Sequence, residues 1–89
     1  PDLQGVYVLT LQPGDSVHRQ RRKYHEFYYV FEGSMYVTVQ YARAVTNPCG
    51  VGCFFHAAPT ESYEIKVSFD SILTARMIVF ELLERSTHS

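Results

Sequence analysis

Two runs of β-branched and aromatic residues, separated by Gly33-Ser34, constrain the fold of this chain more than any other feature. The first run is Phe27–Phe31 and the second is Met35–Tyr41. Residues of these kinds favour strands, and two small residues that include glycine favour a tight turn between them. The pattern predicts an antiparallel β-hairpin in which Glu32 pairs with Met35.

The rest of the chain is also rich in β-strand signals. Four further strands are expected: Val6–Leu11, Cys53–His56, Tyr63–Val67 and Ile72–Glu84. Ser16–Lys23 is a polar stretch, and Ala42–Val51 is expected to be a loop because it contains Asn-Pro and Gly-Val-Gly. Only Ile72–Glu84 is long enough for a helix, and its Met-Ile-Val-Phe centre favours a strand instead. The sequence therefore predicts an all-β fold, an antiparallel sandwich or barrel.

Length and composition limit the classes of protein that remain. A chain of 89 residues is expected to form a single domain, 1–89, and 46% hydrophobic residues exclude a disordered segment. A formal net charge of −1 excludes a global basic field for nucleic acid or anionic lipid, and no apolar run approaches the roughly 18–20 residues of a membrane span. Because the chain begins with Pro1 and has no signal pattern, it is expected to be excised from a longer protein.

The only two cysteines, Cys49 and Cys53, are too few for the disulfide framework of a small secreted module. They are expected to be reduced, with Cys53 in the core. A structural zinc ion bound by this pair is the alternative, although a second pair of ligands at zinc spacing is missing.

Several turn and strand residues together resemble the two conserved boxes of the cupin superfamily, which are small jelly-roll barrels. Pro13-Gly14, Glu26 and Gly33 resemble the first box, and Gly52-Cys53-Phe54-Phe55 with Pro59 resembles the second. The resemblance covers about residues 5–83 and implies a cupin-type jelly-roll β-barrel of short antiparallel strands.

The same resemblance implies where a catalytic cupin would hold its metal ion. Its first-box histidines would fall in the segment 19–22, which reads Arg-Gln-Arg-Arg, and its second-box histidine near 61–63, which reads Glu-Ser-Tyr. Only Glu26 remains of the ligand set, and guanidinium groups would repel a divalent cation. We therefore expect no metal, no cofactor and no catalysis. An unusual site made of His18, His56 and Glu26 is the alternative.

The strand period assigns the hairpin residues to two faces. If Glu26 points into the barrel, as the resemblance implies, Tyr28, Val30 and Glu32 point in with it, and Met35, Val37, Val39 and Tyr41 do the same from the second strand. Five residues then form an outward, largely aromatic patch: Phe27, Tyr29, Phe31, Tyr36 and Thr38. Such patches mark interfaces, so we predict that this one is a homodimer interface. In the alternative, an N-terminal segment or the Ile72–Leu83 strand covers it.

With its metal ligands replaced and its hairpin aromatic, the chain resembles the C-terminal dimerisation domains of the centromere protein C family. The matching segments are Glu32–Val39, Gly52–Phe55 and Ala75–Phe80, whereas Ala57-Ala58-Pro59 departs from the usual turn. The resemblance implies a nuclear, non-catalytic homodimerisation module of a centromere and kinetochore scaffold. It also implies a second partner in some members, an assembly factor for the centromeric histone, with DNA or nucleosome contact mainly through other parts of the parent protein. Reduced cysteines suit a nuclear protein.

Four positive charges cluster before the hairpin: Arg19, Arg21, Arg22 and Lys23. They are candidates for contact with an acidic partner or DNA, and a solvated loop is the alternative. Two other functions remain open at this point. One is a small-ligand-binding regulatory cupin, whose lumen Glu26, Tyr28, Glu32 and Tyr63 would line, and the other is a metal-dependent cupin enzyme.

Overall fold

The computed structural model describes residues 2–19, 23–40, 44–59 and 61–83. These residues form eight strands: β1 (Asp2–Leu11), β2 (Ser16–Arg19), β3 (His25–Glu32), β4 (Met35–Gln40), β5 (Ala44–Cys49), β6 (Phe54–Ala57), β7 (Ser62–Lys66) and β8 (Ala75–Leu83). Within these ranges, no helix is long and apolar enough to cross a membrane.

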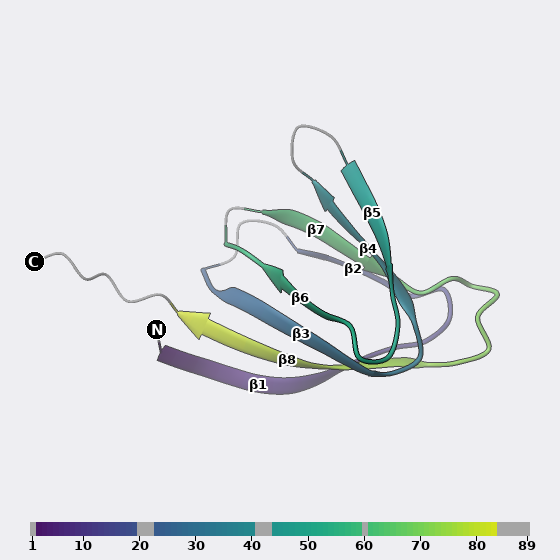
Figure 1. The fold of residues 1–89 in the computed structure, drawn as a ribbon, viewed down its shortest axis with the longest axis horizontal. Helices are drawn as coiled ribbons and strands as arrows, with labels where there is room; N and C mark the ends of the chain where they lie inside the picture. The colour runs from purple at the N-terminus through teal and green to yellow at the C-terminus, as the bar shows by residue number, and fades with distance from the viewer. Residues whose placement is uncertain (1, 20–22, 41–43, 60, 84–89) are drawn as a thin grey trace, which may run out of the picture.

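The strands form two four-stranded antiparallel sheets. Sheet I has the order β1-β8-β3-β6, and sheet II has the order β2-β7-β4-β5. Figure 1 shows sheet I as the lower layer and sheet II as the upper layer. All eight elements of the described residues are strands, so the predicted all-β fold is confirmed. Consecutive strands often lie in different sheets, as in a jelly-roll.

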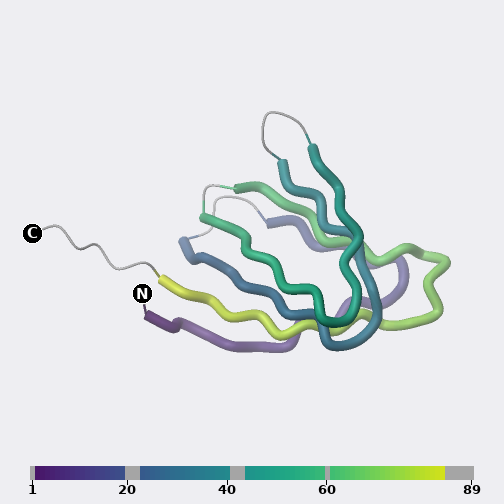
Figure 2. Tube along the Cα trace, in the orientation of Figure 1, coloured from purple at the N-terminus to yellow at the C-terminus, as the bar shows by residue number. Residues whose placement is uncertain are grey.

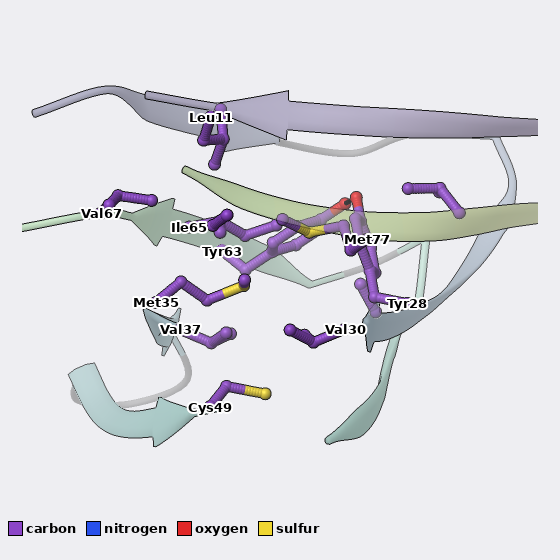
Figure 3. Close-up of a cluster of buried hydrophobic side chains, with 13 residues drawn as sticks. Leu11, Tyr28, Val30, Met35, Val37, Cys49, Tyr63, Ile65, Val67 and Met77 are labelled. Atoms are coloured by element: carbon purple, nitrogen blue, oxygen red, sulfur yellow. Dashed lines mark hydrogen bonds between the residues drawn. The ribbon is translucent and has the colours of Figure 1, made fainter. Parts of the chain in front are cut away.

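The core lies between the two sheets and is filled by alternate residues of their strands. Tyr28 and Val30 of β3 are fully buried, as are Met77 and Val79 of β8. Ile65 reaches the same space from sheet II (Figure 3). The predicted inward positions Glu26, Tyr28, Val30, Met35 and Val37 are confirmed. Val39 is only half-buried and Tyr41 lies outside the described residues.

Glu32 does not point inward as predicted. The pairing of β3 with β8 is irregular between Val30 and Glu32, and this irregularity changes the direction of the next side chain. Glu32 instead forms an exposed ion pair with Arg76, at 3.3 Å.

The predicted hairpin is wrong, although both of its strands exist. β3 pairs with β8 and β6, whereas β4 pairs with β5 and β7, so the chain crosses from sheet I to sheet II at Gly33-Ser34 (Figure 2). A tight turn between two β-rich runs has the same local residues whether the strands pair or separate. Only the pairing of β3 with β8, which lies far along the chain, decides whether the two strands pair with each other or separate.

Gly33 makes this crossing at a position that no other residue fits well. Its φ is 74°, and a Cβ there would lie 2.5 Å from the Thr74 carbonyl oxygen. Gly52 has a similar φ of 90°, but a Cβ added to it would have no other atom within 4 Å. Comparing alanine substitutions at the two positions therefore separates the energetic cost of the backbone conformation, which both share, from the cost of the clash, which only Gly33 has.

We expect Gly33→Ala to destabilise the domain more than Gly52→Ala does. A left-handed conformation costs an alanine about 1–2 kcal/mol, which applies to both variants, and the clash with Thr74 adds to it only at Gly33. Urea unfolding followed by circular dichroism measures both values. Equal losses would show that the Thr74 segment moves away at no cost.

Two segments predicted as polar or loop are edge strands of sheet II. β2 covers the first part of the polar stretch, and β5 covers Ala44–Cys49. Pro48 is tolerated in β5 because β5 is an edge strand, where one side of the backbone needs no partner. Edge strands have one exposed side and few apolar residues, so the hydrophobic pattern did not reveal them.

The cysteines are not reduced as predicted, since Cys49 and Cys53 form a disulfide. The bond joins the end of β5 in sheet II to the residue before β6 in sheet I. Cys53 also accepts a hydrogen bond from the Val30 amide (3.0 Å), and Gly52 donates one to the Val30 carbonyl (2.8 Å). The short turn that the disulfide closes is therefore attached to β3. With both sulfurs bonded, the alternative of a zinc ion held by two thiolates is also wrong.

Reducing this disulfide should lower the free energy of unfolding by about 2 kcal/mol, the chain-entropy value for so small a loop. Urea unfolding with and without a dithiol reductant measures the change. The Cys49→Ser/Cys53→Ser variant is the control, because the reductant should not affect its stability. No change in the unmodified chain would contradict a stabilising role for the bond.

Candidate functional site

Glu26, the one buried charged residue in the described part of the chain, lies at the centre of the barrel and is 1% exposed. Tyr28 donates a hydrogen bond to its Oε1 at 3.0 Å, and Tyr63 donates a second, short one to the same oxygen. Tyr7 lies 3.5 Å from Oε2. The carboxylate is therefore enclosed by phenol hydroxyls from β1, β3 and β7.

These phenols remain protonated donors at neutral pH. Burial is the main cause that raises the pKa of Tyr28 well above its ordinary value, and the negative charge of Glu26 raises it further. Burial likewise raises the pKa of Tyr63, and its hydrogen bond to Glu26 adds to the effect. Neutral phenols suit the carboxylate, because each offers one O–H for it to accept.

Arg19 extends from β2 toward the same cluster. Its Nε is buried without a hydrogen-bond partner, while another part of the side chain hydrogen-bonds Tyr28. Burial lowers the pKa of the guanidinium, but attraction to Tyr7, Tyr28 and Glu26 outweighs it and leaves the pKa raised. The cation thus lies beside the buried carboxylate.

This position of Arg19 differs from the predicted basic patch. We expected its charge at the surface with Arg21, Arg22 and Lys23, for an acidic partner or DNA. Its guanidinium is partly withdrawn into the barrel instead, and Lys23 is exposed. Arg21 and Arg22 lie outside the described residues.

The histidines do not converge on Glu26, so the predicted alternative site is wrong. His18 pairs with Glu64 at 2.9 Å on the outer face of sheet II, and His56 lies in β6 of sheet I. Among the residues whose placement is described, no three His, Cys, Asp or Glu side chains form a group suited to a metal ion.

Six of the twelve exposed large hydrophobic side chains in the described part of the chain lie on the outer face of sheet I. We name it the apolar face, and it comprises Leu3, Val6 and Val8 of β1, Ile78, Phe80 and Leu82 of β8, Phe27, Tyr29 and Phe31 of β3, and Phe54 of β6. Six of these side chains are 39% exposed or more. The face is continuous, because its residues other than Phe31 are cross-strand neighbours, and Phe31 follows them in β3.

Two rows of such neighbours run across all four strands. Val6 pairs with Phe80, Phe80 with Phe27, and Phe27 with His56. The second row is Val8, Ile78, Tyr29 and Phe54. Beside Phe54, which is 59% exposed, lies a shallow apolar hollow of about 320 Å³ lined by Leu3, Phe27, Phe54, Phe80 and Leu82.

The predicted interface residues divide between the two sheets. Phe27, Tyr29 and Phe31 lie on the apolar face, whereas Tyr36 and Thr38 lie in β4, on the outer face of sheet II. There Thr38 hydrogen-bonds Thr46 at 2.9 Å, and Tyr36 borders a hollow of mixed polar and apolar lining that includes Lys66 and Glu64. The prediction of one contiguous patch was therefore wrong, because it depended on the hairpin.

The alternative that the chain covers its own aromatic face is also contradicted. Within sheet I, β8 lies beside β3 and β1 lies beside β8, so neither strand lies over the face. They extend the face with Val6, Val8, Ile78 and Phe80. The sequence did contain a signal for these residues, since inward and outward residues alternate along both β1 and β8. The sheet that the two strands join, however, depends on long-range pairing.

Comparisons with known proteins give a match by structure only. No protein-family profile matches the chain, and no curated protein matches it by sequence. The fold, by contrast, is found in several solved structures.

Three of these solved structures show the range of similar proteins. Drosophila melanogaster CENP-C bound to CAL1 superimposes with a TM-score of 0.75 at 14% identity, covering 85% of this chain and 62% of that one. The Cnp3 cupin domain of Schizosaccharomyces pombe gives 0.76 at 15%, covering 89% and 52%. A predicted oxalate decarboxylase of Thermotoga maritima gives 0.75 at 18%, covering 92% and 68%.

This chain thus spans 62% and 52% of the CENP-C and Cnp3 chains, and a protein named as a predicted oxalate decarboxylase has the same architecture. Identities this low report the fold and not the activity. The TM-scores of 0.75–0.76 show that the two facing antiparallel sheets have the same arrangement in all three. The chain therefore adopts the cupin fold, which it shares with the cupin domains of CENP-C and Cnp3.

Proposed function

We propose that this domain is a non-catalytic homodimerisation module that pairs two copies through the apolar face. The observation that carries the proposal is the continuous apolar surface across all four strands of sheet I. Its three exposed aromatic side chains, Tyr29, Phe31 and Phe54, are 40%, 39% and 59% exposed. At about 150–250 Å² for each aromatic side chain, they alone leave roughly 200–350 Å² of apolar surface in water.

Leu3, Val6 and Val8, each more than half exposed, enlarge the patch further. The largest apolar patch on a typical monomer is about 300–600 Å² and is often functional. A surface of this size with few charges favours an apolar occupant over an acidic or basic one. We therefore place a partner on it.

The shape of the face favours a second copy as that partner. Phe54 projects beside the hollow lined by Phe80 and Leu82, so one surface carries both a projection and a recess. A two-fold axis brings the same patch of both chains together, and each Phe54 can then meet the hollow of the other chain.

The structural similarity to CENP-C and Cnp3 supports the finer part of the proposal, a nuclear role in a centromere and kinetochore scaffold. Pairing two copies of a long scaffold makes its second attachment intramolecular, at an effective concentration of about millimolar. Avidity for nucleosomes and kinetochore proteins then rises without any new contact. The Drosophila domain was solved with CAL1, which supports a second protein partner for this chain, such as a centromeric-histone assembly factor.

The alternative of a small-ligand-binding cupin has less support, because the centre of the barrel is occupied. Glu26, Tyr28 and Tyr63 satisfy one another there, and Arg19 lies beside them. A ligand would have to displace these hydrogen bonds and replace each of them. The same occupied centre argues against a metal-dependent enzyme.

Light scattering across a dilution series tests the proposal. We expect a mass of about twice 10.3 kDa at high concentration, falling toward 10.3 kDa on dilution. A monomer at every concentration would overturn the proposal and would make a ligand of the barrel the first alternative.

A further inference from the structure

Two imidazoles meet on the outer surface of sheet I, away from the Glu26 cluster. His25 lies in β3 and His56 in the neighbouring strand β6. His25 Nδ1 and His56 Nε2 are 2.8 Å apart, and the ring planes are inclined by 18° with their centroids 5.0 Å apart. A facing pair of imidazole nitrogens shares one proton or binds one cation between them.

The sheet holds this pair in place. His56 is directly opposite Phe27 in the pairing of β3 with β6, and their rings stack with centroids 4.5 Å apart and planes inclined by 10°. Stacking fixes the plane of the His56 ring and leaves its nitrogen edge directed at His25. In the single chain His56 is exposed at the β6 edge of sheet I, so an ion from solvent can reach the pair there.

We propose that His25 and His56 form a binding site for one divalent transition-metal ion of the Cu²⁺, Ni²⁺ and Zn²⁺ group. Neutral imidazole is a preferred ligand of these ions. With metal–nitrogen bonds of about 2.0–2.1 Å, two ligands at a right angle have their nitrogens about 2.9 Å apart. The observed separation of 2.8 Å is close to that value. Because the centroids are 5.0 Å apart, the two nitrogens now face each other nearly in line, so each ring has to turn within its plane toward an angle of about 45° from that line to direct its lone pair at a common ion.

Binding of the ion by the two imidazoles needs no co-reactant to take up a proton. The proton that now lies between His25 and His56 moves to the other nitrogen of its own ring. Both facing nitrogens then offer a lone pair, and each imidazole remains neutral. Among the described residues, no third His, Cys, Asp or Glu joins the pair in a group suited to a metal ion, so the two imidazoles are the ligands that this part of the chain supplies.

Titration of the purified domain with CuCl₂, NiCl₂ and ZnCl₂ by isothermal calorimetry tests the site. We expect one ion per chain. His25→Gln and His56→Gln should each weaken binding by at least about tenfold, since even the outer partners of metal ligands contribute about 10- to 100-fold. Two separate variants keep the test valid if one of them fails to fold.

His18→Gln is the matched control. His18 is also an exposed strand histidine, but it pairs with Glu64 on sheet II, and its replacement should leave the affinity unchanged. His88 is present in every variant, so any binding by it is common to all. In NMR spectra, Cu²⁺ should broaden the resonances of Phe27 and His56 before those of β2. Binding that survives both His25→Gln and His56→Gln, or no binding to the unmodified chain, would overturn the proposal.

Discussion

The double substitution Tyr29→Asp/Phe54→Asp should convert the dimer into a folded monomer. The two residues are cross-strand neighbours in the middle of the apolar face, and their side chains are 40% and 59% exposed in one chain. In a dimer, four carboxylates would be brought together within a face made of apolar side chains. Unpaired buried charges cost several kcal/mol each, more than a dimer of this size can lose.

Light scattering at a concentration where the unmodified chain is dimeric measures this outcome, and far-ultraviolet circular dichroism verifies the fold. The matched control is Tyr36→Asp/Thr38→Asp on the outer face of sheet II, which should remain dimeric. If the control dissociates and the first variant does not, self-association uses sheet II. The residues of β4 that were predicted from the sequence would then form the interface.

The control matters because the sequence could predict the faces of the strands but not their neighbours. Alternation about Glu26 correctly assigned Tyr28 and Val30 to the core, and Phe27 and Tyr29 to the outer face of the sheet, where Phe27 is half-buried. The period of two is a property of any strand, so it is readable without the fold. Which strand lies beside which depends on residues far apart in the chain, and there the hairpin prediction failed.

The cluster around Glu26 has the same mixture of local and long-range causes. A buried position for Glu26 followed from the period and the resemblance, but the partners of its carboxylate come from β1, β2, β3 and β7. Arg19 was expected in a solvated or partner-binding basic segment, because four cations in five residues are usually exposed. The disulfide was missed for a simpler reason: two cysteines were judged too few for the disulfide framework of a small secreted module, and spacing alone does not decide the oxidation state.

The second large effect is expected inside the barrel, from Glu26→Leu. The substitution removes the acceptor of the Tyr28 and Tyr63 hydroxyls and the negative charge beside Arg19. Removing one partner of a buried charged group costs about 3–5 kcal/mol. Since a domain is typically stable by only about 5–15 kcal/mol, the variant should be marginal in urea unfolding.

A double-mutant cycle with Arg19→Met separates charge from packing. If Arg19 compensates the carboxylate, Arg19→Met/Glu26→Leu should be more stable than Glu26→Leu alone, because the cation no longer lacks its counter-charge. Glu26→Gln is the isosteric comparison: it keeps an acceptor for the phenols and should lose less than Glu26→Leu. Additive losses in the cycle would show that Arg19 and Glu26 are independent. Unchanged stability of Glu26→Leu would show that the cluster does not hold the barrel closed, and a ligand could then replace it at little cost.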